Sequence, residues 1–551
     1  MHLLNSSLLT FIRENRWLLL ALCFFVVWKI FLVHTLWLDR LLPPVPDDSL
    51  VYALHIDATL NCPNFFSCHE RAINLGTFAG YDHLTYRLFV GTVGKIFSLG
   101  TIASYEVVFY IGILILAIAL LFFSRSLNPG NKKLAAYSLF LFALFNGSGS
   151  FHGFYWVVPS FFAFVFFILI AGLIIDEKRP FPWCWLFILS LLGLFTHIIF
   201  LYSLLIFVLY FVFFSLFTRK FEFFTLAKIA FVIFIACSFY FPVETHYKKQ
   251  SLHSPYGPLE ITDSILHESN SPETALGRKF GINLPDTNKL FSGWSKINNN
   301  YFRWVFPNLL SYIAFCICFA ILFYFKQYRL LSLYLASLVF TLVSTLNING
   351  ERSLLFLWPF TFLYFGHGAW FSMKIIQEKC PGTFVRMFLK LLTLTIVIFF
   401  VFLTLLYSYL WNKYLNQAGN LNIQPGLVEY IFDNTQNKKL VSYSEKAYVI
   451  DLLLLLKDPE NIPQRSADPA DTALFIAVSQ ERLLKDKVKQ QVLFSNFFAI
   501  VTRTLDFKRS DTLNEEDSRE LPERTDLIFS NKKTFGDINV YTVSKKPWSS
   551  Q

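Results

Sequence analysis

Long apolar runs separated by short polar segments dominate the first three quarters of this 551-residue chain. A run of about 20 apolar residues can cross a bilayer as a helix. Such runs lie near residues 16–37, 104–124, 134–147, 153–175, 182–197, 199–218, 226–243, 304–325, 329–346, 353–371 and 387–411. As one helix, the stretch from 182 to 218 would exceed about 50 Å, which is too long for a single span. We therefore expect a break at Thr196–His197 and about eleven transmembrane helices in all.

The pattern changes after residue 411. Strand-like runs occur at 439–443, 473–478, 497–501 and 538–543, and helix-like stretches occur at 445–457 and 479–491. Alternating strands and helices predict a small α/β domain over 412–551, following a transmembrane domain over 1–411. No glycine-rich phosphate-binding motif opens a helix in this region, so nucleotide binding has no support. The predicted fold class is an α-helical polytopic membrane protein with a small α/β C-terminal domain.

Composition agrees with a membrane protein. Hydrophobic residues make up 54% of the chain and charged residues only 16%, a balance that a soluble protein of this size would not show. The net charge of +10 comes from the first part of the chain, because basic and acidic residues balance from Lys413 onward. This surplus is typical of loops that face an anionic cytoplasmic leaflet. No aromatic-basic motif indicates nucleic-acid binding.

The distribution of charge sets the expected topology. Arg13 and Arg16 precede the first apolar run, and no small-residue cleavage site follows it, so we expect an uncleaved signal anchor with a cytoplasmic N-terminus. Lys and Arg then concentrate in every second loop. An odd number of spans places the C-terminal domain outside, together with long loops at 38–103 and 244–303. The amphipathic stretch 86–97 is expected to lie in the plane of the interface.

Two carboxylates, Asp47 and Asp48, follow the first span within a proline-rich turn. Ionisable residues beside a membrane are functional candidates because they are costly to hold there. If a helix begins at Ser49, then Asp48, Tyr52 and His55 share one of its faces. Alternatively, the acidic pair only caps this helix and complements its dipole.

Further ionisable residues gather at the outside ends of the predicted spans. A carboxylate base can take a proton from an acceptor while cations stabilise a phosphate leaving group. No cofactor is needed if the donor is already an activated lipid phosphate. With Asp47 and Asp48 as catalytic candidates, the candidate substrate-binding residues are Tyr52, His55, His83, Arg87, His152, His197, Lys248, Arg352 and Lys29.

Several of these residues have ordinary structural alternatives. Lys29 can extend outward to lipid phosphates. His152 follows a turn sequence rich in Gly and Ser and can reflect simple loop polarity. His197 can hydrogen-bond a backbone carbonyl at the expected helix break. Arg352 can pair with the adjacent Glu351.

The first outside loop also holds candidate metal ligands and a cysteine pair. His55, His69 and His83, with the two aspartates, could bind a divalent cation. No His-Glu-x-x-His or comparable spacing occurs, so no metal centre is predicted. Cys62 and Cys68 lie close together in this loop. A disulfide is plausible there because that side of the membrane is oxidising.

The segment Pro46-Asp47-Asp48, followed by Tyr52, resembles the corresponding loop of the GT-C superfamily of membrane glycosyltransferases. This superfamily includes protein O-mannosyltransferases and bacterial lipid A aminoarabinose transferases. The chain departs from the family pattern in its second acid, which is often Glu, and in the insert at 56–84. No sequon-recognition motif of the oligosaccharyltransferase type is evident in the tail.

The layout of the whole chain is also similar to this family. Its members have an amphipathic helix in the first outside loop, short helix pairs near a His, and a long polar loop after the seventh span. They also have a late outside Arg before a span that contains Pro. In this chain these features match 86–97, His197, 244–303, Arg352 and Pro359.

The resemblance implies an inverting transfer of a sugar from a polyprenyl-phosphate donor at the extracytoplasmic face. It implies Asp47 as the base with Asp48 assisting, and donor-phosphate binding by Arg352 and by Lys29 or Lys248. The acceptor would be a lipid, a glycan or a protein, and the expected location is a bacterial inner membrane.

Three other functions are compatible with parts of the pattern. An O-antigen ligase or polymerase would use the loop 244–303, with His246, His253 or Arg303. A lipid-linked sugar flippase should show repeats and broken midplane helices, and the sequence shows neither. A scaffold would need the tail but not the aspartates.

Overall fold

The computed structural model describes most of the apolar part of the chain and four strands of the tail. The described residues are 2–37, 83–145, 157–176, 182–197, 199–219, 223–251, 309–344, 350–379, 426–435, 440–443, 472–478, 526–535 and 538–546, with shorter pieces within 52–61 and 382–405 and at 521.

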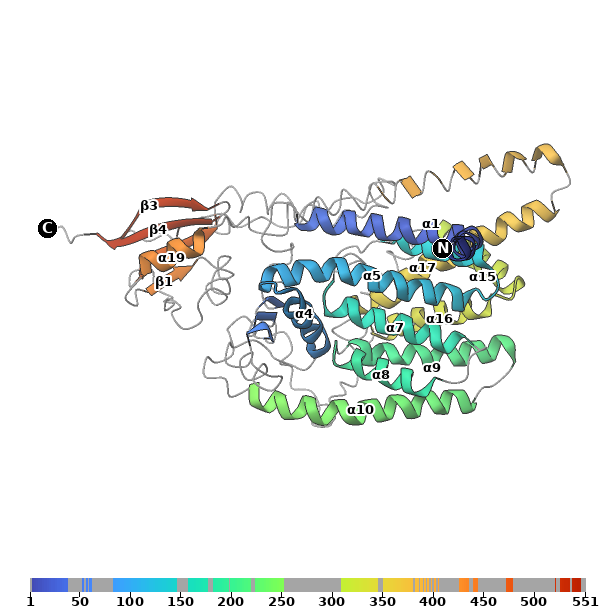
Figure 1. The fold of residues 1–551 in the computed structure, drawn as a ribbon, viewed down its shortest axis with the longest axis horizontal. Coiled ribbons are helices and arrows are strands. Elements are labelled where there is room, and N and C mark those ends of the chain that lie inside the picture. The colour runs from blue at the N-terminus through green and yellow to red at the C-terminus, as the bar shows by residue number, and fades with distance from the viewer. Residues whose placement is uncertain are drawn as a thin grey trace. The chain divides into compact units, whose positions relative to one another are not determined.

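The described part of the chain is mostly helical (Figure 1). Its main helices are α1 (His2–Trp37), α4 (Leu84–Phe97), α5 (Thr101–Leu127), α6 (Lys132–Leu144), α7 (Pro159–Ile175), α8 (Trp183–Leu194), α9 (Ile199–Thr218), α10 (Phe223–Ser251), α15 (Leu309–Tyr324), α16 (Tyr328–Ser344), α17 (Gly350–Lys379) and α19 (Leu427–Thr435).

Ten of the eleven predicted apolar runs coincide with one of these helices, and the eleventh, 387–411, is described only in pieces. The expected break at Thr196–His197 is confirmed, because α8 ends at Leu194 and α9 begins at Ile199. By length and composition, four described helices could cross a membrane, and shorter apolar helices accompany them. The number of spans and their orientation stay predictions. The four described helices that are long and apolar enough to cross a membrane are Arg13–Thr35, Thr101–Leu127, Ile199–Thr218 and Thr225–Pro242.

The chain divides into two compact units. The first contains residues Met1–Val33, Ala79–Phe89 and Val107–Ser408, and the second contains His34–Phe78, Val90–Glu106 and Tyr409–Gln551. The predicted boundary at 411 remains a prediction.

In the first unit, α1 and α6 run parallel. Three contacts along their length join residues that are 118, 116 and 116 positions apart, a nearly constant spacing. Lys132 Nζ lies 3.3 Å from Glu14 Oε2, the rings of Phe24 and Phe140 are 5.2 Å apart, and Lys29 donates to a carbonyl just after α6. Such a constant offset between contacts is what two parallel helices of equal rise produce.

Aromatic side chains fill the space between the inner helices. The Tyr334 ring of α16 stacks on Tyr364 of α17 with centroids 4.2 Å apart. Phe167 of α7 packs 4.9 Å from both Phe207 of α9 and Phe356 of α17. These rings are fully or nearly fully buried, and interlocking aromatic rings contribute both buried area and edge-to-face attraction.

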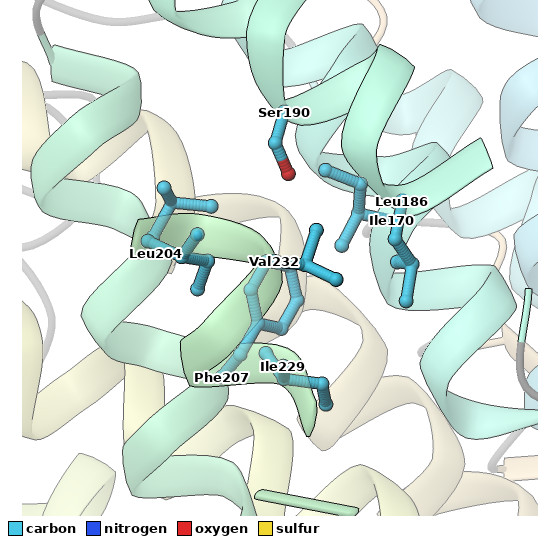
Figure 2. Close-up of a pocket in the computed structure, with 8 residues that line it drawn as sticks. Ile170, Leu186, Ser190, Leu204, Phe207, Ile229 and Val232 are labelled. Carbon is cyan, nitrogen blue, oxygen red and sulfur yellow. The ribbon is translucent and has the colours of Figure 1, made fainter. Parts of the chain in front are cut away.

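A small cavity lies between α7, α8, α9 and α10 (Figure 2). Its volume is about 10 Å³, and its lining is apolar except for Ser190. A void of this size is comparable to a single water molecule. It is therefore too small to receive a substrate. The lining residues are Ile170, Leu186, Ser190, Leu204, Phe207, Ile229, Val232 and Ile233.

In the second unit, Asp57 ties a short helical piece that precedes α4 in sequence to the start of α5. Its Oδ1 accepts from Thr101 Oγ1 at 3.0 Å and from Asn61 Nδ2 at 2.8 Å. Gly94 of α4 packs so closely against this region that an added Cβ would meet Leu60 and Ser104 within 3.1 Å. A glycine is required there for close approach.

The tail forms a four-stranded sheet in the order β1-β2-β4-β3. Its strands are β1 (Leu440–Tyr443), β2 (Thr472–Val478), β3 (Leu527–Phe535) and β4 (Ile538–Lys545). β1 pairs with β2 in parallel, β4 pairs with β2 antiparallel, and β3 and β4 form an antiparallel pair. Buried Phe475, Ala477 and Tyr541 form a core cluster on this sheet.

Three strands of this sheet were predicted, and two elements were not. The runs at 439–443, 473–478 and 538–543 are strands, as expected. β3 was missed because four of its nine residues, from Asn531 to Thr534, are polar or charged and exposed. α19, which contacts β2, was also missed. The predicted strand 497–501 and helices 445–457 and 479–491 lie outside the described residues.

Candidate functional site

Two histidines that are far apart in the sequence meet where α4 begins and where α8 breaks into α9. The His83 and His197 rings are 5.4 Å apart, centroid to centroid. His83 Nδ1 lies 3.1 Å from the carbonyl oxygen of Thr196. Thr85 joins the same turn, donating from its amide to Phe195 O at 3.0 Å. We call His83, Thr85, Thr196 and His197 the His83–His197 joint.

The turn between α8 and α9 is held by its own side chains. Thr196 Oγ1 donates to Leu192 O at 2.6 Å, and Thr85 Oγ1 donates to the same carbonyl at 2.9 Å. Leu192 O belongs to the last turn of α8, whose carbonyls lack partners within the helix. Gly193 is needed because a Cβ there would meet the Phe200 ring at 2.6 Å. The break is therefore a turn that specific hydrogen bonds stabilise and attach to α4.

The hydrogen bonds fix the protonation pattern of both rings. Ile199 N–H donates to His197 Nδ1 at 3.1 Å, so this nitrogen carries no proton and the neutral ring has its proton on Nε2. His83 Nδ1 faces a carbonyl, which only accepts, so this nitrogen is protonated. His197 thereby caps the start of α9 in the manner of an N-cap residue.

Arg87 and Tyr86 continue the site along α4. Arg87 lies four residues after His83, which places both on one face of the helix. Its side chain is 4% exposed, and a guanidinium keeps its charge even when buried. Tyr86 OH donates to Val157 O at 3.2 Å and packs edge-on against Phe162. The start of α7 is thus tied to α4 beside the joint.

Lys29 lies in a separate place in the same unit. Its side chain is fully buried, and its Nζ donates to the carbonyl of Phe145, the residue that caps α6. The Phe25 ring lies 6.0 Å away. The alternative in which Lys29 extends outward to lipid phosphates is not observed, because α6 and its cap cover the side chain.

The structure places the remaining predicted residues less completely. Lys248 lies in α10 and Arg352 in α17, and their side chains are not among those described. Tyr52 lies in a short helical piece of the second unit and is half-buried. Asp47, Asp48, His55 and His152 lie outside the described residues.

The structure describes only part of the loop that was predicted to hold metal ligands and a disulfide. Within the described part of the chain, no three His, Cys, Asp or Glu side chains come together in a way that could hold a metal ion. His69 and the pair Cys62 and Cys68 lie outside that part.

A second polar site, which sequence reasoning missed, lies between α5, α6 and α17. Ser138 Oγ is 2.8 Å from His367 Nε2, and Asn128 Nδ2 donates to the same hydroxyl at 3.0 Å. Ser138 itself donates to Leu134 O, so His367 Nε2–H must be the donor in this contact. His367 and Ser138 are fully buried. One available signal was a histidine near the end of a predicted span.

No protein-family model and no curated protein sequence matches the chain. Among solved structures, the archaeal oligosaccharyltransferase AglB from Archaeoglobus fulgidus, in complex with an inhibitory peptide and a dolichol-phosphate, aligns with a TM-score of 0.52 at 11% identity. The alignment covers 88% of this chain and 71% of AglB.

The chain therefore shares the fold of AglB. This confirms the resemblance in its fold, and it supports an integral membrane protein. A structure of the Archaeoglobus fulgidus oligosaccharyltransferase in the apo form is also similar, with a TM-score of 0.44 at 12% identity over 86% of this chain and 71% of that one. Neither likeness assigns an acceptor.

Proposed function

We propose that this chain is a membrane glycosyltransferase that moves a sugar from a polyprenyl-phosphate-linked donor to an acceptor at the extracytoplasmic face. The observation that carries this proposal is the fold shared with AglB over 88% of the chain. AglB binds dolichol-phosphate, which is a polyprenyl phosphate, and this supports a donor of the same chemical class here.

The reaction we propose is a displacement with inversion at the sugar. The bond between the anomeric carbon and the donor phosphate breaks as the acceptor oxygen or nitrogen bonds to that carbon. The acceptor proton passes to Asp47, with Asp48 assisting, and polyprenyl phosphate leaves with the bonding electron pair. Cationic side chains would stabilise the charge that develops on the leaving phosphate. We assign this role to Arg352 with Lys248 or Lys29.

The His83–His197 joint is proposed to position the substrate. It fixes the start of α4 to the α8–α9 turn, and so holds the end of the first outside loop next to two helix N-termini. Helix N-termini and a guanidinium both favour a nearby anion. Arg87 lies on the same face of α4 as His83 and brings a permanent positive charge to the joint.

Lys29 is the weakest of the proposed phosphate ligands. Its buried hydrogen bond to Phe145 O supports a role in holding α1 against the end of α6. Binding a phosphate would require exchanging this carbonyl for the ligand. We therefore rank Arg352 and Lys248 before Lys29.

We propose the acceptor class from AglB, whose fold is similar, and an assay should first determine this class. AglB is bound to an inhibitory peptide, which makes a protein acceptor the first class to test, followed by lipids and glycans. The sequence favours enzymes of the O-mannosyltransferase or aminoarabinose transferase type, since the tail has no evident sequon-recognition motif.

The proposal is tested by changing each aspartate of the pair to asparagine. The full chain is purified in detergent and given labelled polyprenyl-phosphate sugars with peptide or lipid acceptors. Asp47→Asn removes the base and is expected to lower transfer by about 10²–10⁴-fold. Asp48→Asn should have a smaller effect. Full activity in both variants would contradict the proposed mechanism.

Asp57→Asn is the matched control in the same outside loop. Its carboxylate already accepts from Thr101 and Asn61, and asparagine keeps one acceptor oxygen. Transfer by this variant should stay near that of the unmodified chain. An equal loss in Asp47→Asn and Asp57→Asn would indicate loop damage in place of a missing base.

A further inference from the structure

An apolar groove lies on the first unit between α1, α6 and α17, away from the His83–His197 joint in sequence. Its volume is about 550 Å³, which falls within the range of about 300–1,000 Å³ typical of small-molecule sites. Trp17 and Leu20 line it from α1 and are 52% and 59% exposed. Ala136 and Phe140 line it from α6. The groove is therefore open along its length and lined by hydrocarbon.

One wall of the groove is held rigid by hydrogen bonding and stacking. Tyr137 of α6 donates from its hydroxyl to Gly366 O at 3.2 Å and packs against Trp370 of α17, with centroids 5.1 Å apart. Gly366 permits this approach, since an added Cβ would meet Leu141 Cδ2 at 2.8 Å. The wall is thus preformed by α6 and α17, as a binding groove requires.

Basic residues stand at one end of the groove. Lys133, at the start of α6, lines it directly. The guanidinium of Arg16 lies 5.4 Å from the Trp17 ring. The neighbouring Lys132 pairs with Glu14 at 3.3 Å, so of the two lysines it is Lys133 that faces the groove.

We propose that this groove binds an anionic phospholipid of the surrounding bilayer. One acyl chain lies along the apolar part between α1 and α6, and the headgroup phosphate meets Lys133. Basic pockets between membrane helices bind anionic lipid headgroups, and a Lys at a helix end reaches the interface in the same way. This site is separate from sugar transfer and holds whether or not the chain is a glycosyltransferase.

Lipid retention on the purified full chain tests this site. Phosphatidylglycerol and phosphatidylcholine with identical acyl chains are titrated onto the protein in neutral detergent, and bound lipid is counted by native mass spectrometry. The unmodified chain is expected to prefer phosphatidylglycerol. Lys133→Gln should reduce that preference about fivefold, the effect of one basic residue near an anionic headgroup.

Two further variants keep the result decisive. Lys228→Gln is the matched control, since Lys228 is also an exposed lysine beside a tryptophan, 6.0 Å from the Trp183 ring, but does not line the groove. Its preference should stay that of the unmodified chain. Leu20→Gln changes an exposed lining residue and should weaken both lipids alike. Equal behaviour of Lys133→Gln and Lys228→Gln, or unchanged binding of both lipids to Leu20→Gln, would overturn the proposal.

Discussion

The chain places histidines in two polar sites of opposite character. In the His83–His197 joint the rings bond to main-chain groups of a turn, at Thr196 O and Ile199 N–H. In the site between α5, α6 and α17, His367 bonds to the Ser138 side chain and is fully buried. One site is built on a break between helices, and the other is packed inside the helix bundle.

If the joint meets the substrate as we propose, the difference separates a ligand-binding site from one that only holds helices together. His83 is half-buried, and the joint fastens the start of α4 to the break between α8 and α9. His367 has no hydrogen-bond partner for its Nδ1 among the described residues, and Ser138 occupies its other nitrogen. A buried acceptor without a partner is tolerated at a cost, which suits a role in packing.

Removing the His367 ring should give the largest loss of stability. His367→Ala leaves a cavity between α6 and α17 and strips Ser138 of a donor, so we expect the free energy of unfolding to fall by about 3 kcal/mol. The thermal midpoint of the purified chain in detergent measures this. Sugar transfer per folded molecule should be unchanged. A loss of transfer without a loss of stability would contradict the assignment of His367 to packing.

Two tyrosines give a smaller and more finely matched comparison. Tyr86 and Tyr137 each donate from the phenol to a backbone carbonyl at 3.2 Å, the first to Val157 O beside the joint and the second to Gly366 O beside His367. Changing either to Phe should cost about 1 kcal/mol of stability, the net value of one hydrogen bond.

Only Tyr86→Phe should also change transfer kinetics, because only Tyr86 lies beside the joint. We expect its KM for the donor to rise while Tyr137→Phe keeps that of the unmodified chain. Steady-state kinetics on both variants, in the same detergent, measure the difference. Identical KM values for the two variants would remove the distinction.

The sequence predicted the helices better than the contacts between them. Apolar runs are long and fall where the helices lie, and the length of 182–218 alone predicted the break at Thr196–His197. The predicted topology puts His83 and His197 on the same side of the membrane, but their 5.4 Å contact depends on how α4 packs against α8. Periodicity carries no information about such a contact between residues 114 positions apart.

Two predictions show the limits of residue type as a guide. Lys29 was a candidate for phosphate binding or for reaching the headgroups, and the structure gives it the Phe145 carbonyl, which a linear pattern cannot reveal. The Asn128–Ser138–His367 site was missed because its members come from three helices and only meet in the fold.

The most direct test of the joint as the functional site is a transfer assay on His197→Ala beside His367→Ala. Both full-length variants receive the same labelled polyprenyl-phosphate sugar and acceptor, and rates are divided by the amount of folded protein. His197→Ala removes the side chain that accepts from Ile199 N–H and loosens the turn, so transfer should fall by about 100-fold, the cost of misplacing a substrate by about 1 Å. His367→Ala should transfer at the unmodified rate. Full transfer by His197→Ala, or an equal loss in both variants, would contradict the assignment of the joint to substrate binding.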